Sequence, residues 1–165
     1  MPTVEARVHV EVSPELAFAV SQTTGEVRRR WDVFIREQRF LDGATEAAKG
    51  VRTFTRQRFG PSMISRYVSY APPTNVGMTM ERGPWFFSKM GGGWRFTPDG
   101  AGTLAVWKYN FACRPAWLAP LAERIGACIL GREIRTRIAG FARGCSDPVV
   151  LAEAAKAVAR RQSGA

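Results

Sequence analysis

Alternating hydrophobic and polar residues dominate the first two thirds of the chain. Over residues 3–12, valines and Ala6 occupy one face and charged or polar residues the other, which predicts a half-buried strand. Six later segments are rich in β-branched or aromatic residues and are separated by turn residues such as Asp42-Gly43 and Pro72-Pro73. These segments are residues 33–41, 51–59, 63–71, 75–82, 85–97 and 102–112. Short strands joined by short turns predict an antiparallel meander.

Helical patterns flank this series of strands. Ser13-Pro14 combines a capping residue with a first-turn proline, and Thr24 is suited to cap a second short helix. After Arg114-Pro115, apolar residues recur every three or four positions, which predicts a long amphipathic helix over 115–143. The sheet has an apolar face that must be covered, and this long helix is the obvious cover.

A second helix is predicted after the long one, because Asp147-Pro148 restarts a helical pattern. We therefore expect one domain over residues 1–146 and a helical tail over 147–165. The tail either belongs to the same domain or contacts another copy in an oligomer.

Three consecutive glycines, Gly91-Gly92-Gly93, raise the question of a phosphate-binding loop. Such a loop needs a helix directly after the glycines, usually with a lysine followed by Ser or Thr. Here Trp94 and Phe96 alternate with charged or polar residues as in a strand, and Pro98-Asp99-Gly100 then forms a turn signal. The glycines are therefore interpreted as a kink or bulge inside a strand.

Composition narrows the class of protein. The 165 residues suit one domain, and the apolar runs are too short to cross a bilayer. The first residues lack a signal-peptide pattern, and three distant cysteines predict a reducing cytosol without disulfides, so we expect a cytoplasmic protein. The net charge of +10 invites anionic partners, but the basic residues are scattered, so no specific nucleic acid is predicted.

Few residues suit acid–base or metal chemistry. His9 is the only histidine and lies on the polar face of the first strand, so neither a metal site nor a nucleophilic triad is predicted, and no cofactor is expected. Glu37 and Glu81 are candidate inward acids, although neighbouring arginines make exposed ion pairs the preferred interpretation. Tyr67 or Tyr70 could donate a proton to a carbonyl, or could be a core aromatic residue.

Four local patterns resemble the helix-grip superfamily (SRPBCC), which includes START lipid-transfer domains and bacterial polyketide cyclase/dehydrase-like proteins. The patterns are VHVEVSPELAFAVSQ, Trp31-Asp32 before an extended segment, YAPPTNVGMTM, and GAGTLAVWKYNF before Arg-Pro and a long helix. The resemblance spans residues 4–145. The helical tail and the triple glycine depart from the family pattern. The resemblance implies an α+β fold in which a curved antiparallel sheet of six to seven strands wraps around the C-terminal helix, with two short helices after the first strand.

A cavity between sheet and helix is the site that this resemblance implies. Alternation along the strands selects the side chains that would line it if their faces point inward, and the long helix adds two more. The candidate cavity residues are Ile64, Arg66, Val68, Tyr70, Met78, Met80, Trp94, Phe96, Trp107, Tyr109, Leu121 and Ile125. Such a lining suits a flat or flexible apolar guest, but the same side chains could instead fill the core. Arg66 would meet an anionic ligand group or Glu81, unless the register is shifted by one residue.

Three functions remain open at this stage. The first is binding or carriage of a hydrophobic small molecule, of lipid, polyketide or other aromatic or isoprenoid type. The second is a metal-free cyclase or dehydratase that uses polar residues of the cavity. The third is a basic surface that contacts acidic lipid or nucleic acid. A transient membrane-surface contact and a homodimer are further partner hypotheses.

Overall fold

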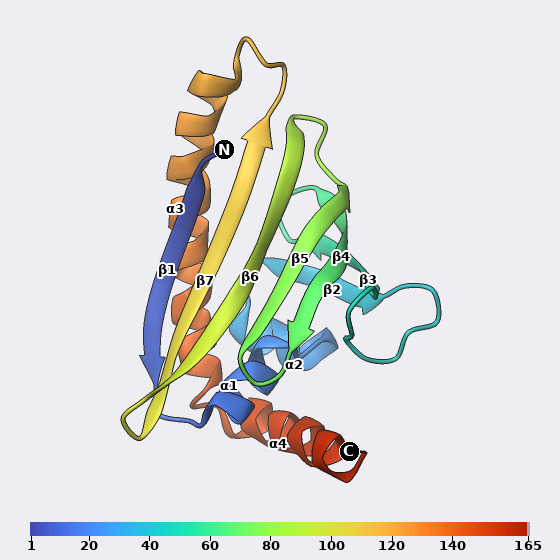
Figure 1. Cartoon of the computed structure of the whole chain (residues 1–165), viewed down its shortest axis with the longest axis vertical. Coiled ribbons are helices and arrows are strands. Elements are labelled where there is room, and N and C mark those ends of the chain that lie inside the picture. Colours follow the sequence, from blue (N-terminus) through green and yellow to red (C-terminus); the bar gives the residue numbers. More distant parts are fainter. Residues whose placement is uncertain (165) are drawn as a thin grey trace.

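A curved antiparallel sheet is the main feature of the computed structural model, which describes residues 1–164 (Figure 1). Within those residues the sheet has seven strands in the order β1-β7-β6-β5-β4-β3-β2. The strands are β1 (Thr3–Val10), β2 (Ile35–Phe40), β3 (Arg52–Gln57), β4 (Ser62–Ala71), β5 (Asn75–Arg82), β6 (Phe87–Asp99) and β7 (Gly102–Cys113). Consecutive strands from β2 to β7 pair as neighbours, and β1 closes the far edge against β7. The predicted meander is confirmed.

Two short helices follow β1, and a long helix covers the sheet. They are α1 (Pro14–Ser21), α2 (Gly25–Trp31) and α3 (Ala119–Gly144). Ser13 caps α1 by accepting a hydrogen bond from the Leu16 backbone N–H, as its position before Pro14 predicts. Figure 1 shows α3 running alongside β1 and β7, the two strands against which it packs.

The last helix, α4 (Pro148–Ser163), packs against α1 at one end of the molecule (Figure 1). Asp147 caps it, because the carboxylate accepts hydrogen bonds from the backbone N–H groups of Val149 and Val150. Val150 and Ala154 are fully buried and belong to the main hydrophobic cluster. The tail therefore shares the core of the rest of the chain.

One end of the core lies where α1, α2 and the C-terminal half of α3 meet the sheet. Phe18, Trp31, Ile134 and Phe141 are all fully buried there. Helices α2 and α3 approach closely, since a Cβ added to the α3 residue Gly144 would lie only 2.8 Å from the Trp31 Cβ. Close packing at this end holds α2 and α3 in fixed positions beside the sheet.

The three glycines lie inside β6, where each is paired with strands on both sides. A Cβ added to Gly92 would lie 2.8 Å from Cδ1 of Tyr109, and one added to Gly91 would lie 2.9 Å from the Met78 carbonyl oxygen. Neighbouring strands thus come too close for side chains at this point. Figure 1 shows β6 curving along its length, so the glycines belong to the curvature of the sheet.

None of the helices within residues 1–164 has both the length and the apolar character that crossing a bilayer would require.

Candidate functional site

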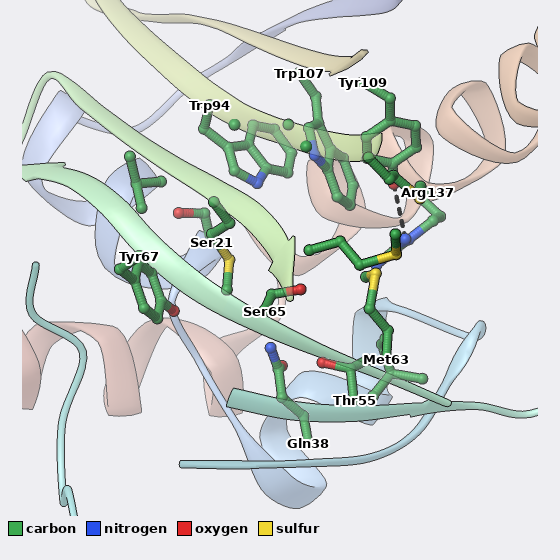
Figure 2. A pocket seen from close by; sticks show the side chains of 18 of the residues that line it. Ser21, Gln38, Thr55, Met63, Ser65, Tyr67, Trp94, Trp107, Tyr109 and Arg137 are labelled. Carbon is green, nitrogen blue, oxygen red and sulfur yellow. Dashed lines mark hydrogen bonds between the residues drawn. The ribbon is translucent and has the colours of Figure 1, made fainter. Parts of the chain in front are cut away.

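An inner cavity of about 130 Å³ lies between the concave face of the sheet, α2 and α3. Figure 2 shows Trp94, Trp107 and Tyr109 on one side of it, facing Gln38, Thr55 and Ser65 on the other. Apolar groups dominate the lining: Met63, Met78, Met80, Met90, Trp94 and Trp107. The two tryptophan rings stack with their centroids 4.1 Å apart. Wide aromatic faces and flexible thioethers suit an apolar guest.

An outer groove of about 440 Å³ adjoins the inner cavity. Its walls are the ends of β3 and β4, the segment around Phe86 and the N-terminal half of α3, and its lining is mostly apolar. The inner cavity and the outer groove share Thr55, Gln57, Met63 and Met90. The two spaces are therefore adjacent, and these four side chains lie between them.

A buried charge cluster lies at the inner cavity: Arg28 from α2, Asp32 just after it, and Arg137 from α3. Asp32 is completely buried, and both arginines are more than nine-tenths buried. Arg137 donates from Nε and Nη2 to the two carboxylate oxygens of Asp32 at 3.2 and 2.7 Å. Arg28 donates from Nε and Nη2 to Asp32 Oδ2 at 3.1 and 2.9 Å. Arg28 and Arg137 both line the inner cavity.

The charges of the two arginines determine the protonation state of Asp32. Burial by itself raises the pKa of Asp32, but the charges and hydrogen bonds of Arg137 and Arg28 outweigh burial and hold that pKa below its ordinary value. Burial is also the main reason that the pKa of Arg28 is lowered, with Asp32 offsetting part of the effect. Arginine stays charged in proteins, so the three groups form an ionised cluster at neutral pH.

Further polar partners extend the cluster. Arg137 Nη1 donates to the Tyr109 hydroxyl at 2.7 Å, drawn as a dashed line in Figure 2, and to Glu133 Oε1 at 3.1 Å. Arg28 Nη1 donates to the Ser21 carbonyl oxygen at 2.6 Å. Glu133 lines the outer groove while Arg137 lines the inner cavity, so their contact lies where the two spaces meet.

Two tyrosine hydroxyls in the inner cavity stay protonated. Burial raises the pKa values of Tyr67 and Tyr109 well above that of a free tyrosine. The Tyr67 hydroxyl donates to Gln22 Oε1 at 3.1 Å. Each can therefore act as a neutral hydrogen-bond donor, and neither titrates near neutral pH.

Five of the expected cavity residues line the inner cavity: Met78, Met80, Trp94, Trp107 and Tyr109. They come from β5, β6 and β7, where clean alternation predicts the inward face. Phe96 also points inward, but it is buried among Phe18, Trp94 and Phe141 and belongs to the filled core. The sequence leaves open whether the inward side chains fill the core or line a cavity. Both occur, with a filled core at one end of the sheet and a cavity at the other.

Three expected residues of β4 lie on the outer face of the sheet instead. Met63, Ser65 and Tyr67 line the inner cavity, so Ile64, Arg66 and Val68 point away from it. Arg66 makes an ion pair with Glu81 on that outer face, and this contact is the main reason that the pKa of Glu81 is lowered. Both faces of β4 mix apolar and polar residues, which is why its alternation does not decide the inward face.

The remaining expected residues lie away from the inner cavity. A register shift between Tyr67 and Ser69 changes the alternation, and Tyr70 packs edge-on against Phe18 beside a separate pocket near α4. Ile125 lines the outer groove and keeps 54 % of its surface exposed, whereas Leu121 is 57 % exposed and lines neither space. The N-terminal half of α3 therefore borders the outer groove rather than the inner cavity.

Sequence reasoning missed the charge cluster, although two signals point to it. Arg137 lies three residues after Ile134 and four before Phe141, which places it on the buried stripe of α3. Arg28 and Asp32 stand four residues apart across the end of α2, a spacing suited to an ion pair. Among residues 1–164, no three His, Cys, Asp or Glu side chains converge as metal ligands do.

Comparison with solved structures shows the same architecture. The Thermus thermophilus protein TTHA0849 has a TM-score of 0.69 at 15 % identity, covering 86 % of this chain and 95 % of that one. A START superfamily protein from Mycobacterium smegmatis has a TM-score of 0.68 at 13 % identity, and the match covers 87 % of this chain and 97 % of that one. XoxI from Bacillus cereus has a TM-score of 0.71 at 10 % identity, and the match covers 89 % of this chain and 97 % of that one. These likenesses confirm the helix-grip fold.

The family assignment comes from the sequence. No curated protein matches the chain significantly. Residues 1–145 match the family described as polyketide cyclase/dehydrase and lipid transport, and α4 lies beyond the matched part. That description supports the binding of hydrophobic ligands in general. The chain therefore belongs to the polyketide cyclase/dehydrase and lipid transport family.

Proposed function

We propose that this protein binds or carries a hydrophobic small molecule, of lipid, polyketide or other aromatic or isoprenoid type, in the inner cavity and the outer groove. One observation carries the proposal: a chamber walled by stacked tryptophans and four methionines adjoins a larger apolar groove. Ligand sites are typically concave and apolar with a few placed polar groups, which matches this lining.

The volumes of the inner cavity and the outer groove favour one placement of the ligand. An apolar cavity of roughly 150 Å³ accommodates a single benzene ring, so the inner cavity of about 130 Å³ suits one ring or a short branched chain. The rest of the ligand would lie along the outer groove. Burial of apolar surface drives such binding, at about 0.8 kcal/mol per methylene group removed from water.

Filling the inner cavity tests the proposal. Ser65 is buried and lines this space, so Ser65→Phe places a ring inside it. Val68→Phe is the matched control, because Val68 lies on the outer face of the same strand. The probe is N-phenyl-1-naphthylamine, a neutral dye whose fluorescence rises in apolar surroundings. We expect wild type and Val68→Phe to bind the dye at micromolar concentration and Ser65→Phe to bind at least tenfold more weakly.

Equal dye binding by wild type and both variants would contradict the proposal, as would no binding to wild type. Circular dichroism and thermal unfolding establish that each variant is folded. Native mass spectrometry of freshly purified protein supplies a second readout, since a retained guest would add a discrete mass and identify its chemical class.

Exposed aromatic side chains near the outer groove support the prediction of a transient membrane-surface contact. Trp85 and Phe86 pack edge to face beside the groove, and Trp117 precedes α3; all three are exposed. Tryptophan favours the boundary between water and lipid, where a hydrophobic ligand would be collected or released. The homodimer stays a prediction.

A further inference from the structure

We propose that the charge cluster at the inner cavity binds an anionic oxygen group of the ligand, such as a carboxylate or phenolate. This inference rests on the proposed function and adds a ligand class to it, namely an amphipathic acid whose apolar part occupies the cavity and groove.

Net charge is the first argument. Arg28 and Arg137 carry two positive charges, and the fully buried Asp32 carries one negative charge, so these three groups hold an excess of one positive charge. An unbalanced charge that is buried in a protein is costly, and a nearby anion offsets that cost. Glu133 now supplies the balancing charge through its contact with Arg137. Since Arg28 and Arg137 both line the inner cavity, a ligand anion there can take the place of Glu133.

Donor capacity is the second argument. A guanidinium group carries five N–H donors and no acceptor. Within residues 1–164, Arg28 donates to Asp32 and to the Ser21 carbonyl oxygen through three hydrogen bonds. Two of its N–H donors thus remain for another acceptor. Hydrogen bonds from a guanidinium group to a carboxylate are shorter and stronger than those between neutral groups.

Glu133 is the third argument, because its carboxylate already sits where a ligand anion would compete. It contacts Arg137 Nη1 at 3.1 Å, lines the outer groove, and keeps 13 % of its side-chain surface exposed. It balances the excess charge from the mouth of the inner cavity. A ligand carboxylate that enters from the groove would take over this contact while Glu133 turns toward water.

The prediction is that neutralising Glu133 strengthens the binding of an acid and leaves a neutral analogue unaffected. The variant is Glu133→Gln, which keeps the size of the side chain. The probes are 2-naphthoate and 2-naphthalenemethanol, which share the same ring system. Affinities are measured by quenching of tryptophan fluorescence at pH 7, with calorimetry as a second method.

In Glu133→Gln we expect 2-naphthoate to bind about tenfold more tightly than 2-naphthalenemethanol, which corresponds to one charge-assisted hydrogen bond. This ratio should exceed the wild-type ratio. Glu153→Gln is the matched control, because Glu153 pairs with Lys156 on α4, away from the inner cavity and groove. It should leave both affinities at wild-type values.

A ratio near one in Glu133→Gln, or a ratio unchanged from wild type, would overturn the inference. Binding of 2-naphthalenemethanol and the neutral dye would still uphold the proposed function in that case. If wild type bound none of the three probes, the proposed function itself would be contradicted. The failure of the inference and the failure of the proposed function are therefore distinguishable.

Discussion

The two halves of α3 carry one continuous apolar stripe but have different surroundings. In the C-terminal half, Ile134, Ile138 and Phe141 are buried against β1, β7 and α2. In the N-terminal half, Ile125 and Ile129 remain more than half exposed and border the outer groove. Hydrophobic periodicity thus identifies the apolar face of the helix, whereas the neighbouring elements determine whether that face is covered or lines an open space.

Truncation of the buried half should have the largest effect on stability. Phe141→Ala removes a fully buried ring that contacts Trp31 and Trp94, so we expect the free energy of unfolding to fall by about 4 kcal/mol. Ile125→Ala should lower it by less than about 1 kcal/mol, because that side chain is mostly exposed. Urea unfolding followed by circular dichroism measures both values, and similar losses would refute the comparison.

Asp32 links α2 to the buried half of α3, so Asp32→Asn should lower the free energy of unfolding by about 3 kcal/mol. Its pKa is lower in the folded protein than in the unfolded chain, so the folded state binds the proton less readily. The resulting stabilisation is complete above the ordinary aspartate pKa of about 3.9 and is lost as pH falls through the folded-state pKa.

Acid titration of stability separates this contribution from those of other carboxylates. The difference in unfolding free energy between wild type and Asp32→Asn should shrink as pH falls below about 4. A constant difference from pH 7 to pH 2 would show that the charge of Asp32 does not stabilise the fold.

Two glycines of α3 test the packing of this helix through smaller expected changes in stability. A Cβ at Gly140 would clash with the Trp31 carbonyl oxygen, whereas a Cβ at Gly131 would meet only Arg135 Nη1, at 3.5 Å. Gly140→Ala should therefore destabilise the protein by about 2 kcal/mol. Gly131→Ala should stabilise it by roughly 0.5 to 1 kcal/mol, because alanine favours the helix. Thermal unfolding midpoints should move in opposite directions, and a shift in the same direction would contradict the packing described for Trp31.

The alternation of apolar and polar residues and the turn residues were enough to predict the succession of antiparallel strands. They also predicted the inward faces of β5, β6 and β7. They failed for β4 because Ile64 and Met63 lie on opposite faces, each beside polar neighbours, so neither face is clearly apolar. The register shift before Tyr70 then reversed the alternation within one strand. A bulge of this kind depends on pairing with β5 and leaves no distinct pattern in the sequence.

The local pattern of residues by itself determined the helices, the antiparallel meander and the stripe that makes α3 the cover of the sheet, because each depends on neighbours close along the chain. Only the tertiary structure decided where the sheet leaves a cavity and which arginines reach it. Asp32 and Arg137 are 105 residues apart and meet only after α2 and α3 pack together. Packing distances between such distant segments are set by the whole fold, so no local pattern could have revealed them.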